Sequence, residues 1–75
     1  MNKKEIGRRL VGARGAMSQA EAAGKIGITR SSLAMYEIGQ RIPKDDVKIL
    51  ISLAYKIPIQ ELFFKGEGHV RGPAV

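Results

Sequence analysis

Two helix-start signals stand close together in the middle of the chain, with a glycine between them. Ser18-Gln19-Ala20-Glu21 has a serine followed three residues later by a glutamate, the capping-box pattern of a helix N-terminus. Gly27 is placed to end that helix, because glycine adopts the left-handed conformation at low cost, and Thr29 is a second N-cap residue. The sequence therefore predicts two short helices, over 19–26 and about 30–38, joined by a tight turn.

This spacing alone leaves the function open. A DNA-binding helix-turn-helix has this spacing. An ordinary corner between two helices of a small bundle also has it, because both use the same glycine and the same caps.

Apolar periodicity predicts further helices on both sides of this pair. Apolar residues recur at helical spacing over 3–14, and the segment from about 45 to 56 is apolar over more than one face. Pro58 is suited to begin a last helix that runs through Phe64. We expect an all-α fold of five short helices within residues 1–65, and a flexible tail over 66–75, where Gly and Pro are frequent.

Length and composition exclude several classes of protein. A chain of 75 residues holds one domain, which buries only about 60% of its unfolded surface. The absence of Cys excludes a disulfide scaffold, a Cys-ligated zinc site and a cysteine nucleophile, and makes the cytoplasm the expected location. No apolar run approaches the roughly 20 residues that a membrane span needs.

The charge balance raises the question of a partner. The chain has 13 Lys and Arg against 7 Asp and Glu, a formal net charge of +6. Nucleic acid, an anionic membrane surface and plain solubility all explain such an excess. Nine of the 13 basic residues precede Asp45, against three acidic ones, which favours DNA. The segment 3–14 has too few large apolar residues to rest on a lipid surface.

Nothing in the sequence indicates an enzyme, a metal site or a cofactor. His69 is the only histidine and stands in the predicted tail, so no metal site or catalytic base can be built around it. Asp45 and Asp46 are adjacent, hence point apart on a helix, and the chain has no glycine-rich phosphate loop. We therefore expect neither an enzyme nor a small-molecule substrate.

The central segment carries a family signature. SQAEAAGKIGITRSSLAMYEIGQRIP resembles the helix-turn-helix of Cro and phage repressors, the XRE family of bacterial and phage regulators. The shared motifs are Ser18-Gln19, Gly27-Ile28-Thr29, Tyr36-Glu37 and the loop from Gly39 to Pro43, and the segment IPIQELFF is similar to the family's last helix. The resemblance covers residues 4–64 and implies a five-helix, lambda-repressor-like domain that binds double-stranded DNA.

The resemblance also implies which residues meet the bases. The helix that begins at Arg30 enters the major groove, with Arg30, Ser31, Ser32 and Met35 as candidate base contacts. Arg30 suits a bidentate contact to guanine, with a phosphate contact or a solvated charge as the alternative. Ser32 could instead bond to the preceding helical turn. For Met35, packing is favoured over contact with a thymine methyl group.

Phosphate contacts and an internal ion pair are implied in the same way. The candidate phosphate contacts flank the helix pair: Gln19, Thr29, Gln40, Arg41 and Lys44. Arg14 is expected to pair with Glu37, with Arg9 as a rival because the link after the first helix is shorter than usual. Tyr36 is expected in the core.

The function implied is that of a transcriptional regulator, a repressor, that acts in the cytoplasm, at the nucleoid, as a homodimer. Its operator would be a palindrome with half-sites about 34 Å apart. Surplus apolar residues near the C-terminus are candidates for the dimer interface, with the core as their alternative location: Ile57, Ile59, Phe63 and Phe64. A protein-interaction module, such as an antitoxin with the same fold, is the alternative function.

Overall fold

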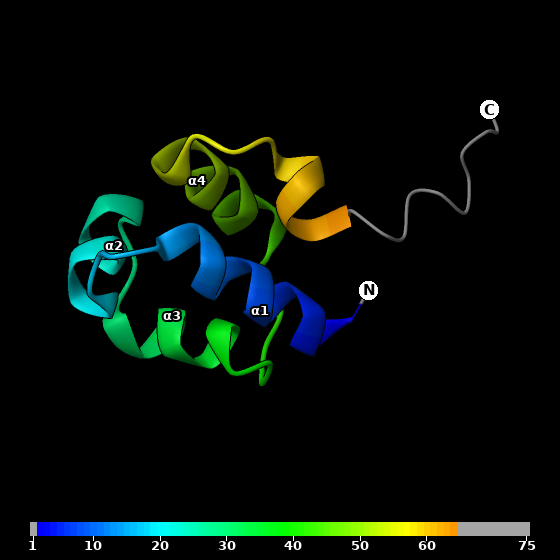
Figure 1. The fold of residues 1–75 in the computed structure, drawn as a ribbon, viewed down its shortest axis with the longest axis horizontal. Coiled ribbons are helices and arrows are strands. Elements are labelled where there is room, and N and C mark those ends of the chain that lie inside the picture. Colours follow the sequence, from blue (N-terminus) through cyan, green and yellow to red (C-terminus); the bar gives the residue numbers. More distant parts are fainter. Residues whose placement is uncertain (1, 65–75) are drawn as a thin grey trace, which may run out of the picture.

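The computed structural model describes residues 2–64, and within this range the fold is entirely helical (Figure 1). Four α-helices are followed by one wider, π-type helical turn: α1 (Lys3–Arg14), α2 (Gln19–Ile26), α3 (Arg30–Glu37), α4 (Asp45–Tyr55) and η1 (Gln60–Phe64). The all-α prediction with five helices is thus confirmed. The predicted tail over 66–75, which contains His69, lies outside the described residues.

The predicted caps account for where α2 and α3 begin. The backbone N–H of Glu21 donates to Ser18 Oγ and that of Ser32 donates to Thr29 Oγ1, each at 3.0 Å. Gly27 ends α2 in the left-handed conformation, with φ at 94°. Because such caps satisfy backbone groups that a helix end leaves open, these boundaries follow from local chemistry.

Pro58 stands at the start of the last helical segment, as expected. Pro58 lies before η1 and contributes only its carbonyl oxygen, which accepts from the backbone N–H groups of Glu61 and Leu62 at 2.9 and 3.3 Å. Ile59 is therefore already helical, and the π-type turn η1 continues from Gln60 to Phe64.

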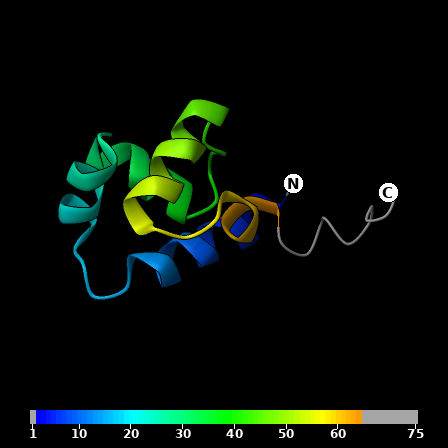
Figure 2. The ribbon, with the colours of Figure 1, turned by 90° about the horizontal axis from the view of Figure 1, so that it is seen from above.

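The helices enclose a core to which α1 is central. α1 packs along α3, and η1 folds back onto α1 so that it lies beside the N-terminal half of that helix (Figures 1 and 2). α2 contacts both α3 and α4. Two of the three buried side chains on α2 are alanines, and the other elements bury large side chains. The buried apolar residues are Ile6, Leu10, Ala22, Ala23, Ile26, Leu33, Tyr36, Ile51, Leu62 and Phe63.

The burial of η1 corrects one expectation about the dimer interface. Phe63 is 0% exposed, so a partner chain cannot reach it without unfolding the domain. Ile57, Ile59 and Phe64 are half-buried and pack against the core cluster. The physical reason is that η1 folds back onto α1 and brings its apolar side chains into the core. The core has room for them because α2 contributes few large side chains.

Candidate nucleic-acid interface

The outward face of α3 carries the residues that the sequence placed against DNA bases. Arg30 and Ser31 are exposed in its first turn, while Leu33 and Tyr36 are buried beneath them. Met35 is 36% exposed and lies outside the core cluster, so both packing and a base contact stay open for it. The helical period separates the two sets, because residues three and four apart share a face.

Ser32 and Thr29 are engaged with each other. Thr29 Oγ1 donates to Ser32 Oγ at 3.0 Å and also accepts the Ser32 backbone N–H. Ser32 therefore bonds back to the N-cap residue one turn earlier, which is the alternative that the sequence left open. Both hydroxyl groups hold the start of α3 in place.

A buried ion pair fastens α3 to α1. Arg14 Nε lies 2.8 Å from Glu37 Oε2 and Arg14 Nη2 lies 3.2 Å from Oε1. The side chain of Glu37 is 3% exposed and that of Arg14 is 19% exposed. The hydrogen bond that Arg14 donates to Glu37 raises the pKa of the Arg14 guanidinium. Arg14 Nη1 also donates to Met17 O at 2.8 Å, so the expected pair is present and extends to the link before α2.

Gln19 joins this network, which sequence reasoning did not anticipate. Its side-chain Nε2 donates to Glu37 Oε1 at 2.8 Å. One carboxylate thereby holds α1, α2 and α3 in a fixed relation, at the base of the exposed turn of α3. The sequence places Gln19 and Glu37 in the family motifs, but no spacing rule in the chain indicates that they touch. A Gln amide has two N–H groups, so one remains for a phosphate.

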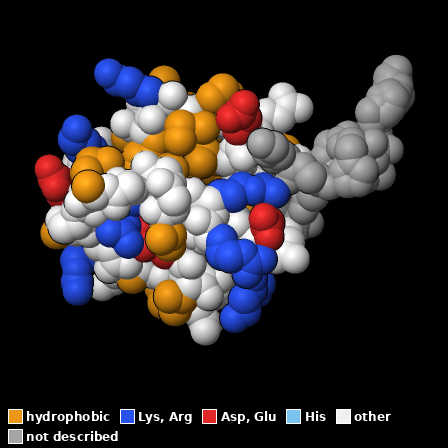
Figure 3. All heavy atoms as spheres, viewed as in Figure 1, with side chains coloured by type: hydrophobic (Ala, Val, Ile, Leu, Met, Phe, Trp, Pro, Cys, Tyr) orange, Lys and Arg blue, Asp and Glu red, His pale blue; other side chains and the backbone are white. Residues whose placement is uncertain are grey.

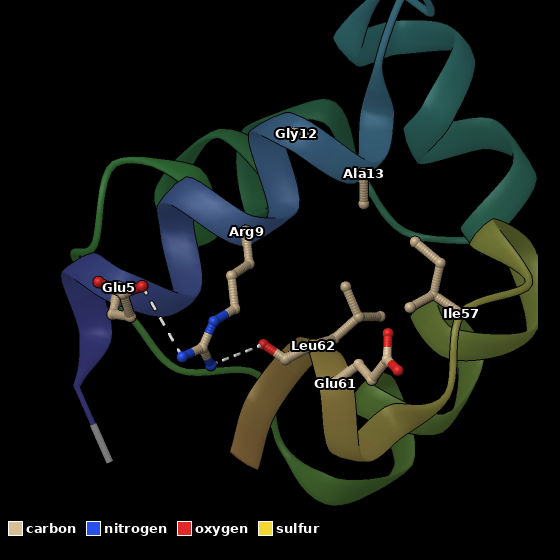
Figure 4. A pocket seen from close by; sticks show the side chains of 7 residues that line it. All are labelled: Glu5, Arg9, Gly12, Ala13, Ile57, Glu61 and Leu62. Atoms are coloured by element: carbon tan, nitrogen blue, oxygen red, sulfur yellow. Dashed lines mark hydrogen bonds and ion pairs between the residues drawn. The ribbon is translucent and has the colours of Figure 1, made fainter. Parts of the chain in front are cut away.

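Arg9, the rival partner for Glu37, lies elsewhere. Arg9 Nη2 is 3.7 Å from Glu5 Oε2, and Arg9 Nη1 donates to Leu62 O at 3.4 Å, which ties α1 to η1 (Figure 4). Glu5 also accepts from Arg8, which lowers the pKa of the Glu5 carboxyl. Arg9, Glu5 and Leu62 border an open hollow of about 640 Å³ between α1 and η1. The hollow is lined by Glu5, Arg9, Gly12, Ala13, Ile57, Glu61 and Leu62.

The loop after α3 supplies the second set of polar residues. Gly39 has a φ of 80° and lies against Lys4, whose Cα would be 3.0 Å from a Cβ at that position. The loop then presents Gln40, Arg41 and Lys44 to solvent. Lys44 is also the N-cap residue of α4, where its side chain makes no capping bond.

The basic residues divide into paired and unpaired ones. Within residues 2–64, ion pairs engage Arg8, Arg9, Arg14 and Lys48, whereas none is recorded for Arg30, Arg41 or Lys44. Figure 3 shows Lys and Arg side chains gathered over the N-terminal end of α1. Unpaired cations beside an exposed helix face suit a polyanion. The described part of the chain holds no cluster of His, Asp and Glu that fits a metal ion, and none of its helices is long and apolar enough to cross a membrane.

Comparisons with known proteins agree with this geometry. A family model described as helix-turn-helix matches residues 13–62. Among solved structures, the restriction-modification controller protein C.AhdI from Aeromonas hydrophila is 30% identical, with a TM-score of 0.77 over 83% of this chain and 93% of that one. The DNA-binding domain of the P22 C2 repressor is 20% identical, with a TM-score of 0.74 over 83% and 84% of the two chains.

The DNA-binding domain of BldD is 23% identical, with a TM-score of 0.71 over 81% of this chain and 92% of that one. No curated protein matches the chain in sequence. The family model and the controller protein each match more than half of the chain, and the predicted resemblance is thereby confirmed. The chain belongs to the helix-turn-helix family of the Cro and phage-repressor (XRE) type and has the fold of a DNA-binding transcriptional regulator.

Proposed function

We propose that this protein is a repressor that binds a palindromic operator in double-stranded DNA as a homodimer. The observation that carries the proposal is the exposed first turn of α3, held by the Glu37 network and flanked by unpaired cations. Such a turn can meet base edges, while Arg41 and Lys44 on the following loop meet the phosphates.

The dimensions of α3 fit the major groove. An α-helix with its side chains is about 10–12 Å across, and the groove is about 12 Å wide, so the exposed face of α3 can enter it. Arg30 is exposed in the first turn of α3 and its guanidinium has the geometry to pair with O6 and N7 of guanine. Ser31 can donate to or accept from any base, so it adds little discrimination.

One α3 helix reads too few base pairs for useful specificity, which is the energetic reason for a dimer. Two copies related by a two-fold axis place two such helices on half-sites about 34 Å apart, and the operator then has the same symmetry. The similar C.AhdI is described as a controller protein, and the similar P22 C2 protein as a repressor. These descriptions support a role in transcription for this chain.

Selection from a random duplex library at about physiological salt tests the proposal, because non-specific binding is weak there. We expect enrichment of a palindrome with guanine at one position of each half-site. If the protein enriches no sequence and binds all duplexes alike with strong salt dependence, the proposal that it recognises a specific operator is wrong. A protein-interaction module, such as an antitoxin, is then the better description.

A further inference from the structure

The outer face of α4 exposes three large apolar side chains that the core does not use. Ile49, Leu50 and Leu53 are 53%, 43% and 69% exposed. Residues three and four apart on a helix are neighbours on its surface, so Leu53 lies beside both Leu50 and Ile49. In the space-filling view, hydrophobic side chains lie exposed over the region of α4 and the segment that follows it (Figure 3). A single exposed Leu is ordinary, but a contiguous apolar stripe marks a contact surface.

Opposite charges stand at the two ends of this stripe. Asp46 lies one helical turn before Ile49, and Lys56 lies one turn after Leu53, just past the end of α4. Both residues are exposed, and within residues 2–64 neither has a recorded ion pair. The neighbouring Asp45 is already close to Lys48, at 3.7 Å. The stripe is therefore acidic at its N-terminal end, apolar in the middle and basic at its C-terminal end.

Such a stripe is complementary to an antiparallel copy of itself. If two α4 helices cross about a two-fold axis at the level of Ile51, Leu53 faces Ile49 of the partner subunit and Leu50 lies close to the axis. The same register brings Asp46 opposite Lys56 of the partner subunit. Apolar and ionic pairs are thus formed in one alignment, as an isologous interface requires.

We propose that the outer face of α4, with Ile49, Leu50 and Leu53 at its centre and Asp46 and Lys56 at its ends, is where two copies of this chain associate. The inference rests on the homodimer of the proposed function, and it replaces the interface expected around Phe63, which is buried. Nucleic acid does not fit this surface, because it is apolar and has Asp46 at its edge.

Sedimentation equilibrium over a range of protein concentrations tests the surface. Leu53→Glu introduces charge at the centre of the stripe, and we expect the dimer Kd to rise at least about tenfold, equivalent to about 1.4 kcal/mol. Val11→Glu is the matched control, since Val11 is 44% exposed on α1, and we expect its Kd to equal that of the wild type. Circular dichroism checks that both variants fold. We expect them to fold, because both substituted side chains are exposed.

Charge reversal tests the register. Asp46→Lys alone and Lys56→Glu alone each place like charges opposite one another, so both should weaken the dimer. An equimolar mixture of the two variants should form a heterodimer with an affinity near that of the wild type, because both pairs are then attractive. The double variant D46K/K56E should also dimerise with an affinity near that of the wild type, because its two ionic pairs are again attractive.

The outcomes separate this inference from the proposed function. If the wild type is a dimer but Leu53→Glu leaves its Kd unchanged, or Val11→Glu weakens it equally, the α4 surface is overturned and the homodimer stands. If the charge variants fail to complement each other, the antiparallel register is overturned. If the wild type remains a monomer throughout, both the surface and the homodimer are overturned, and operator selection still decides DNA binding.

Discussion

At the scale of single residues, Glu37 governs the site. Its carboxylate is buried and accepts hydrogen bonds from Arg14 and Gln19, which come from two different helices. The pKa of Tyr55 is raised, chiefly by burial and secondarily by the negative charge of Glu37. Tyr55 Oη is buried with no hydrogen-bond partner among the described residues. The neighbourhood of Glu37 therefore contains one satisfied carboxylate and one unsatisfied hydroxyl.

The unsatisfied hydroxyl gives a prediction with a pH dependence. Tyr55→Phe should raise the free energy of unfolding at pH 7 by about 1 kcal/mol, because a buried hydroxyl without a partner is costly. The unfolded tyrosine titrates near pH 10 and the folded one higher. Wild-type stability therefore falls as pH rises above about 10, and the variant should lose less over that range. Urea unfolding from pH 7 to 11 measures both effects, and a loss of stability at pH 7 would contradict the assignment.

Arg30 gives a prediction on specificity. Arg30→Ala should relax the preference at one base position of each half-site, since a bidentate contact to guanine discriminates by about 1–3 kcal/mol. Binding measured against operator variants at a single salt concentration checks this. Equal loss of affinity for every sequence would instead identify Arg30 as a phosphate contact.

At the scale of elements, the close packing of α1 on α3 depends on one glycine. A Cβ at Gly7 would collide with the carbonyl oxygen of Glu37 and lie 2.9 Å from that of Tyr36. These are backbone atoms, which cannot give way as a flexible side chain does. Gly12, on the same helix, would meet nothing within 4 Å and borders the open hollow. Two glycines that look alike in the sequence thus have opposite roles.

The same substitution should therefore have opposite effects at the two positions. Gly7→Ala should lower the free energy of unfolding by about 1–3 kcal/mol, because α1 must move away from α3. Gly12→Ala should raise it by up to about 1 kcal/mol, since Ala favours the helix more than Gly does. Chemical denaturation measures the free energy of unfolding of both variants. A change of the same sign in both would refute this account of the α1–α3 contact.

At the scale of the whole molecule, the net charge of +6 acts through the cations that no acid neutralises. The acidic residues Glu5, Glu37 and Asp45 are each close to a basic side chain within the described range. Arg30, Arg41 and Lys44 therefore present their charge to the solvent. DNA binding should accordingly depend steeply on salt, because each phosphate contact releases counterions.

Lys44 provides the test of that dependence. Lys44→Gln should reduce the slope of log K against log salt by about one unit without changing base preference. Lys25→Gln is the control, because it removes the same charge from the last turn of α2, where the slope should not change. A slope unaltered by Lys44→Gln would remove this residue from the DNA contact surface.

Much of this fold could be predicted from the sequence, because its signals are local. Ser18 and Thr29 cap helices through bonds to residues three positions away, and Gly27 ends α2 by its own conformation. The family resemblance predicted Arg30 and Ser31 to face DNA, and the structure exposes both in the first turn of α3. The pairing of Arg14 with Glu37 came from the family resemblance, and the structure brings the two side chains together.

Only the tertiary structure decided which apolar residues the core takes and which it leaves exposed. Composition shows a surplus of apolar residues after Pro43, but not that Phe63 is buried while Leu53 remains in solvent. Local signals also do not distinguish Gly7 from Gly12, or show Gln19 bonded to Glu37. Burial depends on how whole helices pack against one another, whereas caps and periodicity act within a single helical turn. The sequence by itself therefore determined the helices, and packing determined the surfaces they present.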